Sequence, residues 1–142
     1  NPFASKIISG DCNKVFARTG WRSSTGVYRK VWQCSERYKD KGVVGCTNRH
    51  VEEETLVKAY LLAWNALVEN RESFLEWWQK QIQGEDLLAG YRAEKFMEYT
   101  DGVEPLVEMD TIFMLKILDH IKVFEDGVLV VVFLDGTEIE CK

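Results

Sequence analysis

Three of the four cysteines in this 142-residue chain fall within residues 6–50, each at a turn beside a short apolar run. Cys12 ends a Ser-Gly-Asp-Cys turn, Cys34 closes the run 27–33, and Cys46 follows a glycine-rich turn. Thiolates presented from turns between short strands are the ligands with which small β-ribbons hold zinc. By spacing alone, ordinary buried cysteines explain the three thiols about as well as zinc ligands do. In both cases the pattern favours a small ribbon of strands.

The fourth zinc ligand is left open by this pattern. A structural zinc normally takes four ligands, and a ribbon turn usually offers Cys-x2-Cys. Two residues separate Ser9 from Cys12, so Ser9 stands where a fourth cysteine is expected, and a hydroxyl is a poor zinc ligand beside thiolates. His50 is a possible ligand four residues after Cys46, although a structural role at a helix start is the first interpretation. Cys141 is a third candidate, for which packing as a small apolar residue is preferred.

Three stretches of this region resemble the zinc β-ribbon domain of the large serine recombinases, the integrases and transposon resolvase-like enzymes of bacterial mobile elements. They are KIISGDCNKVFAR, VYRKVWQCSERYKDKG and GCTNRHVEEETL. The resemblance covers residues 1–56, is weaker over the helical middle, and returns in the closing VFEDG and LDGTEIE. Cys12, Cys34 and Cys46 match three ligands of the family pattern, whereas Ser9 departs from the first.

The resemblance implies a DNA-binding module without catalytic residues. These recombinases attack DNA with a serine in an N-terminal domain of a different fold, so no serine here is expected to inherit that role. The parent would bind attachment-site DNA in the bacterial cytoplasm during integration or excision of a mobile element, as a dimer on each site and a tetramer in synapsis. Zinc is the implied cofactor, with the fourth ligand in question. Because the chain opens with Asn1 and not Met, we expect a fragment of a longer protein.

Charge is distributed unevenly along the chain, and its distribution favours DNA more than its total does. The formal net charge is −5, which alone argues against nucleic acid. Ten Lys/Arg and three Asp/Glu give residues 1–50 a charge of +7, whereas eight Lys/Arg and twenty acids give residues 51–142 a charge of −12. The basic lobe can hold phosphates, and the acidic lobe is repelled from them. By charge alone, solubility of a small ribbon explains the basic residues equally well.

Eight side chains on the expected hairpin and its loops form the candidate DNA-binding face. Long basic side chains can follow phosphates, arginine can bind guanine edges, and a tryptophan stands beside an arginine at the expected turn tip. For any single residue, a solvated surface is nearly as good an explanation. The eight residues are Arg18, Trp21, Arg22, Arg29, Lys30, Arg37, Lys39 and Lys41.

Hydrophobic periodicity predicts an α+β fold with short strands, a helical excursion and C-terminal strands. The resemblance implies that these strands form a small zinc-ribbon-like antiparallel sheet to which the C-terminal β-hairpins return. Strands are expected at 14–18 and 27–33, and helices at 51–69, 74–83, 87–99 and 111–120, the last capped by Asp110. The tail indicates three strands joined by two Asp-Gly pairs, which suit type I′ turns. We expect a ribbon lobe at 1–50, a helical lobe at 51–120 and hairpins at 121–142 that pack with the ribbon as one compact unit.

A second function is compatible with the same residues. The ribbon can be a metal-free scaffold of a non-catalytic protein-interaction domain, with the helical lobe docking a partner. Duplex binding that weakens steeply with salt separates the two hypotheses.

No apolar run reaches eighteen residues, so a membrane partner is not expected. Cysteines are expected to be reduced, because pairing within the grouped three leaves one thiol over and Cys141 is remote.

Overall fold

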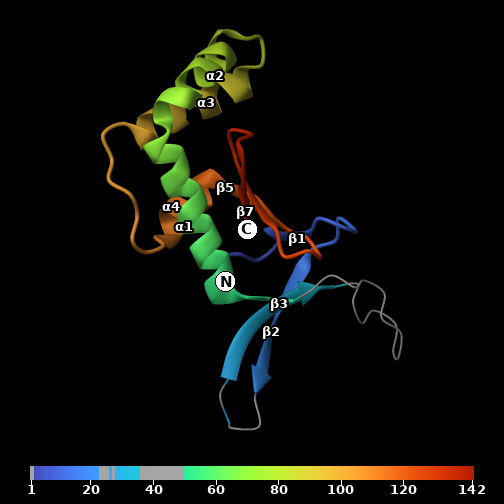
Figure 1. Cartoon of the computed structure of the whole chain (residues 1–142). Helices are drawn as coiled ribbons and strands as arrows, with labels where there is room; N and C mark the ends of the chain where they lie inside the picture. The colour runs from blue at the N-terminus through green and yellow to red at the C-terminus, as the bar shows by residue number, and fades with distance from the viewer. Residues whose placement is uncertain (1, 23–25, 27, 36–49) are drawn as a thin grey trace.

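The part of the chain that the structure describes forms four helices and two β-sheets. The structure, a computed structural model, describes residues 2–22, 26, 28–35 and 50–142. In chain order the elements are β1 (Ile7–Ser9), β2 (Phe16–Arg22), β3 (Tyr28–Cys34), β4 (Val51–Glu52), α1 (Glu53–Glu69), α2 (Arg71–Gln83), α3 (Leu87–Thr100), α4 (Thr111–Ile117), β5 (Leu118–Val123), β6 (Leu129–Phe133) and β7 (Glu138–Cys141). Figure 1 shows the β2–β3 hairpin at one end of the molecule and α2 and α3 at the other, with α1 running between them. The predicted α+β class is confirmed.

The first sheet is a hairpin with a short third strand, in the order β2-β3-β4. The antiparallel register runs from the Phe16–Cys34 pair to the Arg22–Tyr28 pair, and β4 joins β3 opposite Val31 and Trp32. Side chains near the β4 end of the hairpin are buried, whereas Arg29 and Lys30 further along β3 are exposed. Only one end of the hairpin therefore packs against the body of the protein.

The second sheet has the order β1-β5-β6-β7 and contains the C-terminal strands. These strands return to the N-terminal part of the chain, but they pair with β1 and not with the hairpin. β1 lies parallel to β5, with Ile7 opposite Ile121, whereas an antiparallel sheet was predicted. A parallel pair needs a long crossover connection, and the hairpin together with all four helices supplies it. Within the described residues, a single isolated bridge links β1 to the start of the hairpin, where Ile8 pairs with Val15, the residue before β2.

The two Asp-Gly turns of the tail are not the predicted type I′ turns. Gly127 and Gly136 both have φ of +94°, but Asp126 and Asp135 are absent from the non-glycine residues with positive φ in the described part. The amide of each glycine donates to the carbonyl three residues earlier, and each aspartate accepts from the amide two residues later at 3.0 Å. These are three-residue hairpin loops, a type I turn followed by a left-handed glycine. The aspartate side chain thus accepts from the amide of the residue just before the next strand, which favours this turn.

The helices follow their predicted ranges closely, and their boundaries have local causes. The Asp110 carboxylate accepts from the amides of Ile112 and Phe113 at 3.0 and 3.3 Å, so it caps α4 as predicted. α4 stops at Ile117, three residues early, because Leu118 already begins β5 and pairs with Phe133. All helices in the described residues are too short or too polar to span a bilayer.

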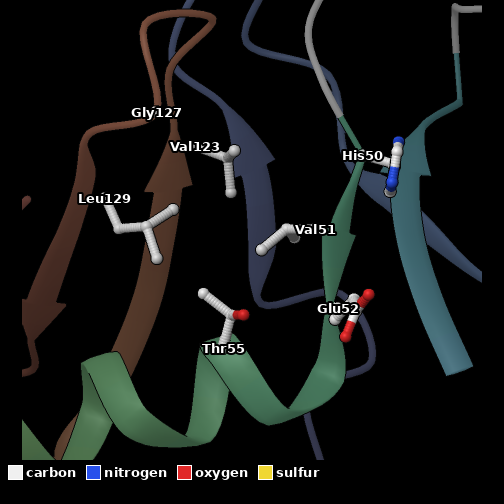
Figure 2. A pocket seen from close by; sticks show the side chains of 7 residues that line it. All are labelled: His50, Val51, Glu52, Thr55, Val123, Gly127 and Leu129. Carbon is white, nitrogen blue, oxygen red and sulfur yellow. The ribbon is translucent and has the colours of Figure 1, made fainter.

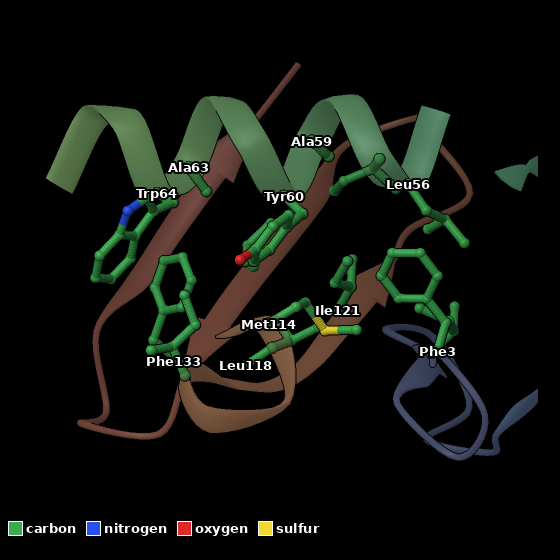
Figure 3. Close-up of a cluster of buried hydrophobic side chains, with 14 of the residues drawn as sticks. Phe3, Leu56, Ala59, Tyr60, Ala63, Trp64, Met114, Leu118, Ile121 and Phe133 are labelled. Carbon is green, nitrogen blue, oxygen red and sulfur yellow. The ribbon is translucent and has the colours of Figure 1, made fainter. Parts of the chain in front are cut away.

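The core lies between α1 and the second sheet. Helix α1 buries Leu56, Ala59, Tyr60, Ala63, Trp64 and Leu67, which share one face at helical spacing. Figure 3 shows this face directed at side chains of β5 and β6, with Phe3 closing one end. The Trp64 ring meets Phe133 and Phe113 edge-on at centroid distances of 5.8 and 5.3 Å. This packing joins the N-terminal segment, α1 and the C-terminal strands into one body.

Candidate metal and nucleic-acid site

The turn after β1 holds the Ser9 side chain inside it. Ser9 is fully buried, and its Oγ accepts from the backbone amides of Asp11 and Cys12, each at 3.2 Å. The Ser9 amide donates to the Lys14 carbonyl at 2.8 Å, and the Asn13 amide donates to the Ser9 carbonyl at 2.9 Å. The turn thus satisfies the hydroxyl at position 9 with two backbone donors, and a thiolate there would meet the same two donors.

Two of the three predicted thiol ligands converge beside this turn. Cys12 Sγ lies 3.4 Å from Cys34 Sγ, although 22 residues separate them. Two sulfur ligands of one tetrahedral zinc are about 3.8 Å apart, given zinc–sulfur bonds of ~2.3 Å. The two thiols therefore fit adjacent ligand positions. Cys46 lies outside the described residues, and within the described ranges no group of three His, Cys, Asp or Glu side chains is arranged to hold a metal.

The two alternative fourth ligands occupy different parts of the fold. His50 lies just before β4 and lines a cavity of about 310 Å³ between the start of α1 and the β5–β6 hairpin, shown in Figure 2. Cys141 is at the end of β7, where its thiol lies 3.7 Å from the Ala59 carbonyl of α1. Burial raises the pKa of the Cys141 thiol, which disfavours the thiolate that metal binding requires. The Cys141 side chain thus packs against α1.

Acidic residues at the start of α1 hold two of the candidate DNA-binding arginines. Arg18 forms a two-point ion pair with Glu53, with N–O distances of 2.7 and 3.1 Å. Arg29 Nη1 lies 2.6 Å from Glu52 Oε1. The Trp32 indole also donates to Glu53 at 3.3 Å. These contacts attach the hairpin to α1, and they place a carboxylate beside each of these two arginines.

The other candidate DNA-binding residues are only partly described. Lys30 is exposed on β3. Trp21 and Arg22 were expected at a turn tip, but their backbone forms the end of β2, opposite Arg29 and Tyr28. The side chains of Trp21 and Arg22, and all of Arg37, Lys39 and Lys41, lie outside the described residues.

Sequence reasoning missed the partners of Arg18 and Arg29. Glu52, Glu53 and Glu54 were interpreted only as acids that favour a helix N-terminus. The structure places Glu53 and Glu54 in the first turn of α1, but Glu52 and Glu53 also reach across to the hairpin. The one available signal was the proximity of an acidic run to a basic hairpin, which does not say which charges meet.

Comparison with known proteins supports one family. Residues 2–65 match the family model described as the recombinase zinc beta ribbon domain. The fold is similar to that in the crystal structure of a large serine recombinase–DNA complex, with a TM-score of 0.58 and 11% sequence identity. The match covers 95% of this chain and 56% of that chain, so this chain spans little more than half of the solved structure. No curated protein matches the chain. Residues 2–65 therefore match the recombinase zinc beta ribbon domain family, and the fold of the chain is similar to that of the solved recombinase.

Proposed function

We propose that the chain binds DNA for a serine recombinase and contacts attachment-site DNA through the basic residues of segment 1–50. The observation that carries this proposal is the projecting β2–β3 hairpin, whose outer part exposes Arg29 and Lys30 (Figure 1). The charge of +7 over residues 1–50 supports it, because phosphate contacts need Lys and Arg. The solved recombinase with a similar fold was crystallised with DNA, which adds to this support.

Two of the candidate arginines would have to leave a carboxylate of this chain to bind DNA. To contact phosphates, Arg18 must leave Glu53 and Arg29 must leave Glu52. The net binding free energy that each contributes is therefore smaller than that of an arginine that exchanges only water for a phosphate. The basic residues at positions 22, 30, 37, 39 and 41 would contribute to the salt dependence as well. Each neutralised phosphate contributes about −0.9 to the slope of log affinity against log salt.

Zinc would have a structural role in this proposal. Cys12 and Cys34 would hold the metal together with Cys46, and Ser9 would leave the fourth position to another ligand, with His50 the candidate. Zinc joins turns of small ribbons that lack a sufficient core of their own. Here it would attach the turn after β1 to the end of β3, at the buried end of the hairpin.

The experiment is a fluorescence anisotropy titration of labelled attachment-site duplex at several salt concentrations. The double change Arg22→Glu and Arg29→Glu is expected to abolish binding, and binding to the unaltered chain is expected to weaken steeply with salt. Lys58→Glu and Lys80→Glu together impose the same charge change on exposed positions of α1 and α2, and should leave binding nearly unchanged. Unchanged affinity in the hairpin variant would refute the proposed interface.

A non-catalytic protein-interaction domain is the second candidate. Two observations favour it: carboxylates of this chain already hold Arg18 and Arg29, and the Ser9 hydroxyl has hydrogen-bond donors without a metal. This candidate predicts weak duplex binding even at low salt. Recombination by the parent protein, its assembly as a dimer on each site and a tetramer in synapsis, and its place in the bacterial cytoplasm belong to the first proposal.

A further inference from the structure

An apolar groove with a basic rim lies between α3 and α4, at a distance along the chain from every candidate DNA-binding residue. Its volume is about 420 Å³. The residues that matter for its chemistry are Leu88, Tyr91, Arg92 and Lys95 of α3, and Leu115 and Lys116 of α4. Figure 1 places α3 at the end of the molecule opposite to the β2–β3 hairpin. A molecule bound in this groove would therefore leave the hairpin accessible.

The lining of the groove includes large apolar side chains that are exposed. Leu88 is 56% exposed, Tyr91 is 59% exposed and Leu115 is 48% exposed. Ala93 and Phe96 already supply the face of α3 that packs into the core, where they are buried. Leu88 and Tyr91 lie beside this core-facing part of α3, and their side chains are left in water in the described protein. Exposed apolar side chains gathered in one groove mark interaction sites more often than scattered residues do.

The charges at the groove contrast with the rest of its lobe. Residues 51–142 contain eight Lys/Arg and twenty Asp/Glu, yet three of those eight cations line the groove and no carboxylate does. Lys95 pairs with Glu98 at 3.4 Å and its Nζ lies 5.5 Å from the centre of the Tyr91 ring. Arg92 and Lys116 form no ion pair with any acid in the described part of the chain.

We propose that this groove docks an amphipathic helix of a partner protein, one whose apolar stripe is flanked by acidic residues. A helix presents apolar anchors at i, i+3, i+4 and i+7, which suits a groove between two helices. Carboxylates beside those anchors would meet Arg92 and Lys116, which gives the charge complementarity that selects a partner. Duplex DNA is a poorer occupant, because apolar side chains form no hydrogen bonds or ion pairs with phosphates. The acidic residues of the surrounding lobe also repel them.

The test uses two synthetic fluorescein-labelled helical peptides with the same leucine stripe, one flanked by glutamates and one by lysines. The acidic peptide is expected to bind the whole chain saturably and at least about tenfold more tightly than the basic peptide. The double variant Arg92→Glu and Lys116→Glu should lose about tenfold or more in affinity, and Tyr91→Ser should also weaken binding. Lys80→Glu, on exposed α2, is the control and should bind like the unaltered chain.

Three outcomes would overturn the proposal. They are equal binding of the two peptides, an equal loss of affinity in Lys80→Glu and the groove variants, and retention of the chain on anionic phospholipid vesicles with no saturable peptide binding. All altered side chains are at the surface or half-buried, so circular dichroism melting curves should stay close to that of the unaltered chain. Matched melting curves assign any loss of affinity to the groove.

Discussion

The hydroxyl of Tyr60 makes a sharp test of the packing around α1. Tyr60 is fully buried on the core face of α1. Among the described residues, its Oη is the buried side-chain polar atom without a hydrogen-bond partner. Burial raises the pKa of Tyr60 above its ordinary value, and the charge of Asp110 raises it further. Tyr60→Phe removes the hydroxyl and keeps the ring, so the surrounding core contacts remain.

The expected effect is a gain in stability. A buried polar group without a partner costs about 1–3 kcal/mol. Removing the oxygen leaves a small void, which costs roughly 0.3 kcal/mol at about 24 cal/mol per Å³. The free energy of unfolding should therefore rise by about 1–2 kcal/mol at neutral pH. Tyr91→Phe is the matched control, because Tyr91 is 59% exposed and its change should stay within about 0.5 kcal/mol.

The same variant predicts a difference in pH dependence. The unfolded chain ionises Tyr60 above about pH 10, whereas the folded chain keeps it neutral. Because the folded pKa is raised, the unaltered protein loses stability as pH rises above 10, by up to about 1.4 kcal/mol per pH unit. Tyr60→Phe lacks this loss, so its advantage over the unaltered protein should widen above pH 10. Below pH 10 the advantage should be constant.

The assay is urea denaturation followed by tryptophan fluorescence, at neutral pH and at several values above pH 10. The two proteins share all their other titratable groups, so the difference in stability between them isolates Tyr60. A fall in stability of Tyr60→Phe at neutral pH would show that the hydroxyl has a partner in solution, such as a buried water. A difference that does not widen above pH 10 would refute the burial argument for the raised pKa.

Three further changes test the site and the second sheet. Glu53→Gln should lower the free energy of unfolding by about 0.5–1 kcal/mol, because its pair with Arg18 is partly exposed, and should tighten duplex binding in anisotropy titrations. Loss of duplex affinity would contradict this. Ser9→Cys should raise the zinc content per chain and the melting temperature, since a thiolate would replace a poor ligand. Zinc content is measured by mass spectrometry, and an unchanged content would contradict this prediction. Asp135→Ala should lower the free energy of unfolding, measured by urea denaturation, by about 1–3 kcal/mol, because the buried Trp78 indole loses its acceptor at 2.8 Å. A change near zero would contradict that hydrogen bond.

Local patterns predicted most of the elements. The helical spacing of apolar residues located α1, Asp110 located the start of α4, and the alternation of the tail located three strands. Sequence motifs in segment 6–50 also indicated the recombinase ribbon family, which the family match over residues 2–65 confirms. The candidate metal and DNA-binding residues stay predictions, and Cys46 with several basic residues lies outside the described ranges.

Periodicity, helix caps and the positions of turns depend on residues a few positions apart, so they can be predicted from the sequence. Which distant segments meet depends on the packing of the whole fold. That packing paired β1 with β5, set Cys12 beside Cys34, and joined Arg18 to Glu53, 35 residues away. An ion pair of this kind gains only about 0–1 kcal/mol over hydration, so no local pattern selects its partners. Burial of the α1 face against β5 and β6 brings those segments together, and the remaining contacts form where that packing places them.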